Sequence, residues 1–256
     1  MATNIVDDIF SNEVQLSISR VCDSTEEELI TNHRRADVLS KYLKQFGFKE
    51  LGCGTNRIVF THVDIPDRAF KIALDSRGIM DNNMEEKLFN DLKDFVPQFY
   101  DNNGLILIAE RVTPLKHSSD YYEYADDIQH VIDSIAPRYI LNDIGPKSFL
   151  NWGVDNVGRF VILDYAYLTP MNGCRTLTCR KCGSGLTYNT DLTMIKCTNK
   201  KCKAVYSIGD IAGSHVDTLT EMGFTDETFD DEIESKKDMI EGETIDEMLG
   251  KMGFVK

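Results

Sequence analysis

The chain has 256 residues, 42% of them apolar, with a formal net charge of -14 and a sequence pI near 4.8. This length allows one large domain or two modest ones with buried cores. The acidic balance argues against nucleic-acid binding by the whole surface, because phosphates repel acidic faces, although a local basic patch remains compatible with it. No segment reaches the roughly 20 apolar residues that span a bilayer, and the first ten residues carry acids where a secretory signal carries Lys or Arg. We therefore expect a cytoplasmic protein without a membrane partner.

The first 46 residues are predicted to be helical. Apolar residues recur at helical spacing between Thr25 and Phe46. Ser24 is a candidate N-cap with Glu27 three residues later, and Gly47 is a stop signal.

Strands and helices alternate in the prediction for residues 47–170. Strands are expected at Ile58–His62 and Arg68–Leu74, with Pro66-Asp67 as their turn, then a helix at Met84–Asp94 and a buried strand at Leu105–Val112. A helix near Tyr122–Ile135, a polar loop at Asn142–Asn151 and a strand at Arg159–Leu163 follow.

Four cysteines further along have the spacing of a zinc ribbon. Cys179-x2-Cys182 and Cys197-x4-Cys202 are separated by fourteen residues, within which strands are expected at 186–188 and 193–196. Zinc takes four thiolates in a tetrahedron, and such a closed shell leaves no position for water. We therefore expect a structural zinc ion; four buried free cysteines would leave the spacing unexplained.

Charge is unevenly distributed around this ribbon. Between Arg175 and Lys203 there are seven Lys/Arg against one acid, a local +6, whereas residues 210–256 carry 14 Asp/Glu and 4 Lys, a net -10. The basic stretch either docks on this acidic tail or is solvated, or it binds an external protein or nucleic acid. Helices expected at 217–224 and 246–254 are either solvated or a partner-binding pair.

Polar residues also interrupt the apolar pattern at regular places. Lys71 lies inside an apolar strand, and a buried Lys is costly unless an acid pairs with it; Glu85 and Glu86 on the next helix are both candidates. Further candidates stand at strand ends or on loops: Gly52, Gly54, Asp143, Asn151 and Asp164. Three of these residues also have a purely structural interpretation: Lys71 could lie on an edge strand with its amine in solvent, Asp143 could cap a loop, and Asp164 could belong to a turn.

The order of these residues resembles the protein-kinase-like superfamily over roughly residues 46–170. The matching segments are Gly52-x-Gly54-x-x-Arg57-x-Val59 (Gly-rich loop), Lys71 and Glu85 (strand Lys and helix Glu), Asn142-Asp143 to Ser148 (catalytic loop) and Leu163-Asp164-Tyr165-Ala166 (metal-binding Asp motif). The resemblance implies a compact α+β bilobal fold with a reduced C-lobe and an inserted zinc ribbon. Its segments would be 1–46 (helical), 47–115 (N-lobe), 116–173 (C-lobe), 174–209 (ribbon) and 210–256 (acidic tail).

The resemblance also implies roles. Gly52 and Gly54 would cover the phosphates of ATP, Lys71 would hold them with Glu85 fixing its side chain, and Asp164 would bind Mg2+. Asp143 would orient an acceptor hydroxyl, and either Asn151 or Ser148 would hold a second Mg2+.

The sequence departs from the family at several of these positions. Arg57 replaces the third glycine, Leu141-Asn142 replaces the His-Arg before Asp143, and no activation segment follows Asp164. Three functions therefore stay open: an ATP-dependent phosphotransferase, an inactive kinase-like adaptor, or a zinc-ribbon protein that binds nucleic acid or the transcription machinery. The missing peptide-docking lobe would suit a small regulatory protein encoded by a phage.

Overall fold

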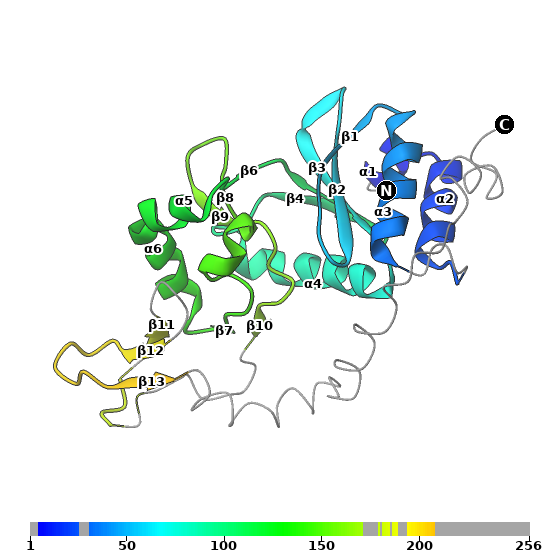
Figure 1. Ribbon diagram of the computed structural model, residues 1–256. Helices are drawn as coiled ribbons and strands as arrows, with labels where there is room; N and C mark the ends of the chain where they lie inside the picture. The colour runs from blue at the N-terminus through cyan, green and yellow to red at the C-terminus, as the bar shows by residue number, and fades with distance from the viewer. Residues whose placement is uncertain are drawn as a thin grey trace, which may run out of the picture. The chain divides into compact units, whose positions relative to one another are not determined.

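The computed structural model describes residues 5–25, 31–170, 179, 181–184, 186–188 and 194–207 (Figure 1). They form an α+β protein with antiparallel sheets, which confirms the predicted class. The chain divides into two compact units. Among the described residues, unit 1 comprises the residues up to Asp120 together with Ser148–Tyr167, and unit 2 comprises Tyr121–Lys147 together with the residues from Leu168 onward. Within the same ranges no helix combines the length and the apolar character needed to cross a membrane.

The main sheet of unit 1 has five antiparallel strands in the order β1-β2-β3-β5-β4. The strands are β1 (Phe48–Cys53), β2 (Arg57–His62), β3 (Ile65–Ala73), β4 (Phe99–Asn102) and β5 (Ile106–Glu110), with helix α4 (Ser76–Leu92) between β3 and β4. The predicted turn at Pro66-Asp67 is wrong, because His62 already pairs with Ile65 and the turn is Val63-Asp64. Pro66 fits inside β3 because β5 pairs with β3 only from Arg68 onward, so its missing N–H removes no bond to β5.

The two faces of this sheet bury different partners. Side chains alternate along a strand, so Phe70 and Ile72 of β3 point to one side and Lys71 to the other. Phe70 and Ile72 belong to an apolar core shared with α1 (Ile5–Ile9), α2 (Asn12–Cys22) and α3 (Asn32–Lys44), shown in blue in Figure 1. Lys71 faces α4 on the opposite side. One face of the sheet therefore packs against the N-terminal helices through apolar side chains, and the other face carries charged side chains.

The predicted helix at Thr25–Phe46 is wrong in its boundaries. Helix α3 begins at Asn32, where the Thr31 hydroxyl accepts a hydrogen bond from the Arg34 N–H at 3.3 Å. Thr31, and not Ser24, is thus the N-cap, while Glu27 lies outside the described residues. The helix ends at Lys44, and Gly47 follows a short turn with a φ of 84°.

Helix α4 starts earlier than the predicted Met84, because Asp75 caps it. The Asp75 carboxylate accepts a hydrogen bond from the Gly78 N–H at 2.9 Å. A Cβ on Gly78 would lie 2.3 Å from the carbonyl oxygen of Asn56 and 3.0 Å from the Cα of Ala73. The first turn of α4 therefore packs directly on the backbone around β2 and β3, which only glycine allows.

A Gly78→Ala substitution tests this close approach. We expect it to destabilise unit 1 by about 1–3 kcal/mol in urea unfolding, the usual cost of overpacking, although Ala is intrinsically the better helix former. Gly52→Ala is the matched control, because no atom lies within 4 Å of its added Cβ. Equal stability of the Gly78→Ala and wild-type proteins would contradict the packing.

The remaining strands form three small antiparallel sheets. Unit 1 contains β6 (Thr113–Pro114), β8 (Trp152–Val154) and β9 (Phe160–Ile162), the last lying within the predicted strand at 159–163. Unit 2 contains β7 (Tyr139–Ile140) paired with β10 (Thr169–Pro170), and the ribbon strands β11 (Leu186–Tyr188), β12 (Met194–Cys197) and β13 (Val205–Ser207).

Two predicted elements of this part of the chain need correction. The helix predicted near Tyr122–Ile135 is two helices, α5 (Ser118–Glu123) and α6 (Ala125–Ile135), separated at Tyr124. The ribbon has a third strand, β13, which the sequence pattern did not predict.

Candidate functional site

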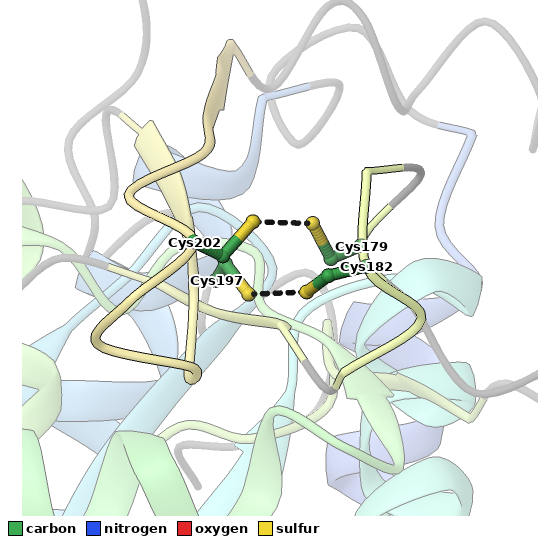
Figure 2. A group of neighbouring side chains, drawn as sticks. All are labelled: Cys179, Cys182, Cys197 and Cys202. Carbon is green, nitrogen blue, oxygen red and sulfur yellow. Dashed lines mark hydrogen bonds between the residues drawn. The ribbon is translucent and has the colours of Figure 1, made fainter.

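The four predicted zinc ligands come together at the ribbon (Figure 2). Their sulfur atoms all lie within 4.8 Å of one another, with 3.6 Å between Cys179 and Cys202 and 3.5 Å between Cys182 and Cys197. A tetrahedral zinc ion with Zn–S bonds of about 2.3 Å places its sulfurs about 3.8 Å apart. The donor set and its spacing therefore fit a four-thiolate ion such as Zn2+.

Each half of this cluster is shaped by a local turn. Cys182 N–H and Gly183 N–H donate to the Cys179 carbonyl at 3.3 and 2.8 Å, and Gly183 has a left-handed φ of 73°. In the second half, Asn199 N–H points at the Cys197 sulfur at 3.4 Å, and Lys203 takes a φ of 51°. Both left-handed residues directly follow the second cysteine of their pair, which bends the chain around one point.

Hydrogen bonds favour thiolates on one half of the cluster. The Tyr206 hydroxyl lies 3.2 Å from the Cys179 sulfur and lowers the pKa of this thiol to about 6, and hydrogen bonding with Ser184 lowers the pKa of Cys182. Burial instead raises the pKa of Cys197 to about 12. A metal ion must therefore displace protons from the second half when it binds.

Removal of the metal should unfold the ribbon, because its described strands have only three or four residues each. We expect one zinc per chain by elemental mass spectrometry, and a lower melting temperature after chelation or in a Cys197→Ser variant. Cys53→Ser is the control, since Cys53 is exposed and lies outside the cluster. Loss of zinc with an unchanged melting curve would contradict a structural role.

A second group of predicted residues meets in unit 1, on the α4 face of the main sheet. Lys71 on β3 donates hydrogen bonds to both carboxylate oxygens of Glu85 on α4, at 2.8 and 2.6 Å, and to the Leu163 carbonyl at 2.6 Å. Glu86, the other candidate partner, is exposed and bonds to Asn102 instead. The charged pair is buried: the side chains of Lys71 and Glu85 are 10% and 1% exposed.

Arg57 completes this cluster and is the residue that the sequence reasoning missed. One of its terminal nitrogens lies 2.8 Å from Glu85 Oε1 and 2.7 Å from Asp164 Oδ1, and the other donates to Asn82 Oδ1 at 3.3 Å. The resemblance assigned Arg57 to a loop, but it is the first residue of β2. Side chains alternate along β2, so Arg57 points away from the face of the apolar Ile58 and lies on the same face as Lys71. This alternation could have predicted its position from the sequence.

The four side chains form a neutral set of two cations and two carboxylates. Burial alone would lower the pKa of Arg57, but Glu85 and Asp164 outweigh it and raise that pKa. Burial alone would raise the pKa of Asp164, but Arg57 and then Lys71 hold it below its usual value. Burial lowers the pKa of Lys71, with opposition from Glu85 and a further contribution from Arg57. Arg57 and Asp164 therefore favour each other's charged forms.

The two predicted loop glycines lie in β1 and in the turn to β2. Gly54 N–H donates to the Arg57 carbonyl at 2.8 Å and closes this turn. An added Cβ would meet nothing within 4 Å at Gly52, and only the Arg57 carbonyl oxygen, at 3.6 Å, at Gly54. Neither glycine has a left-handed φ, so the packing of the described residues does not itself require glycine here.

The residues of the predicted catalytic loop are divided between the two units. Asn151 ends the 3-10 helix η2 (Pro146–Asn151), and its carbonyl accepts a hydrogen bond from Leu163 N–H at 2.7 Å, next to Asp164. Ser148 lies at a kink in η2. Asp143 belongs to unit 2, where it is exposed and has a left-handed φ of 56°. The structure thus gathers Lys71, Glu85 and Asp164, with Asn151 adjacent through the backbone.

No profile of a known protein family matches the chain, and no curated protein matches it. The function is therefore inferred from the residues and geometry above.

Proposed function

We propose that unit 1 is the nucleotide-binding core of a protein-kinase-like protein that takes ATP. The observation that carries this proposal is the buried Lys71–Glu85 pair, which joins the third strand of an antiparallel sheet to the helix that follows it. The order of three strands, one helix and two strands agrees with the resemblance in the sequence.

The energetic cost of burying this ion pair supports a role in binding or catalysis rather than in stability alone. Burying two charges costs desolvation free energy, and apolar side chains of similar volume are often equally stabilising. Clusters of buried charged groups with shifted pKa values also occur preferentially at binding and catalytic sites. The cluster of Lys71, Glu85, Arg57 and Asp164 is such a group.

The proposed roles follow the positions of these residues. The open backbone at Gly52 and Gly54 would approach the phosphates, and Lys71 would hold them with its orientation fixed by Glu85. Asp164 is the accessible member of the cluster, with 32% of its side chain exposed, and is the residue to which the resemblance assigns Mg2+. Asn151, adjacent to Leu163, would support a second ion; Ser148 is the other candidate.

ATP binding measured by calorimetry tests the proposal. We expect Lys71→Met to weaken ATP binding about tenfold to a hundredfold, since a hydrogen bond to a charged group contributes about 1.5–3 kcal/mol. Glu85 keeps Arg57 as a partner in this variant, which should limit the loss of stability, and thermal melting checks that the variant is folded. Lys87→Met is the matched control, because Lys87 lies on α4 but is exposed. Absence of ATP binding by the wild-type protein would contradict the proposal.

Catalysis is a separate part of the proposal and depends on Asp143. A phosphotransferase should release or transfer phosphate from ATP, and Asp143→Asn should lower this rate while leaving ATP affinity unchanged. Nucleotide binding without turnover would instead support the inactive adaptor.

The adaptor alternative draws support from the ribbon, whose described lysines are exposed and suit an acidic partner: Lys181, Lys196, Lys200, Lys201 and Lys203.

A further inference from the structure

We propose that Arg57 is a resident cation of the phosphate site, which neutralises Asp164 and lets nucleotide bind with little dependence on Mg2+. This inference rests on the proposed nucleotide site and concerns how that site balances charge.

The position of Arg57 is fixed on three sides. Its side chain is 6% exposed and bridges Glu85 and Asp164, while Asn82 accepts from its other terminal nitrogen. Asn82 is itself fully buried and donates to the Gly104 carbonyl at 2.8 Å and to the Lys71 carbonyl at 3.3 Å. A guanidinium keeps its charge at all ordinary pH values, so this cation is permanently present.

Arg57 lies beside Asp164, whose negative charge would be neutralised by a metal ion in a metal-dependent site. Lys71 is paired with both oxygens of Glu85, and Arg57 contacts Asp164 Oδ1 at 2.7 Å. Asp164 is the most exposed of the four side chains, so a ligand would reach the cluster from its side. An isolated Asp164 carboxylate would repel phosphate oxygens unless a divalent ion lay between them. Arg57 offsets this repulsion without a metal.

The same contact opposes metal binding at Asp164. Mg2+ takes a near-octahedral shell of oxygens in which a carboxylate supplies one ligand among waters and phosphates, and one Asp164 oxygen already accepts a hydrogen bond from Arg57. A divalent ion would also be repelled by the adjacent guanidinium. Removal of Arg57 should therefore weaken nucleotide binding in the absence of metal and make it strongly dependent on Mg2+.

The test is ATP calorimetry with and without Mg2+, in buffer freed of divalent ions by a chelating resin rather than by soluble chelator, so that zinc stays in the ribbon. For wild type we expect similar affinities in both conditions. For Arg57→Gln we expect a loss of about tenfold to a hundredfold without Mg2+, the value of a charge-assisted hydrogen bond, and a recovery with Mg2+.

A double variant separates charge balance from a merely structural role. Arg57→Gln with Asp164→Asn removes both charges, so metal-free binding should return toward the wild-type value, which simple loss of packing would not produce. Arg57→Lys should retain metal-free binding because it keeps the charge. Arg68→Gln is the matched control, since Arg68 on β3 pairs with Asp67 and stacks on Tyr100, away from the cluster.

The outcomes are distinct. Wild-type binding of ATP that requires Mg2+ would overturn the role of Arg57 even if Arg57→Gln failed to fold. Equal metal dependence of wild type and Arg57→Gln would overturn it as well. Failure of wild type to bind ATP in either condition would instead overturn the proposed nucleotide site.

Discussion

The buried ion cluster on the α4 face is the constraint on which the rest of unit 1 depends. It joins β2, β3, α4 and the segment after β9 through Arg57, Lys71, Glu85 and Asp164. Removing one member of a buried pair leaves an uncompensated charge at a cost of about 3–5 kcal/mol. The helix must therefore hold Glu85 at a fixed distance from the sheet. The close packing of Gly78 and the hydrogen bonds of Asn82 meet this requirement.

The opposite face of the sheet is covered by apolar packing, which stabilises the strands that carry the charged residues. Phe10 stacks on Phe48 and meets Phe70 edge to face, with ring centroids 4.8 and 5.5 Å apart. The N-terminal helices thus cover the sheet with apolar side chains that need no polar partners. In unit 2 the ribbon has little such burial, since Leu186 and Ile195 are its buried aliphatic side chains among the described residues. A metal ion bound by the four cysteines would supply the stabilisation that so small a core lacks.

Features set by local spacing could be predicted from the sequence, whereas those set by tertiary context could not. Each cysteine pair is held by its own local turn, so the gathering of the four cysteines was predictable from their spacing. The α3 boundary was missed because Ser24 is by residue type a better N-cap than Thr31, which is the residue that caps the helix. Strand β4 was missed because Phe99-Tyr-Asp-Asn102 is too short and polar to show a period.

The error at Arg57 is the most informative, because it arose from the family resemblance and not from the residues. Alternation along β2 alone places Arg57 on the face of Lys71, where a buried cation needs an acid. The role that we propose for Arg57 also relates two differences between this sequence and the kinase pattern that it resembles, Arg57 itself and the loop before Asn151. In the proposed nucleotide site, the permanent cation beside Asp164 would take the place of a metal ion there. Ser148 and Asn151, which the resemblance associates with a second metal ion, would then be under less constraint, which is compatible with the kink at Ser148 in η2.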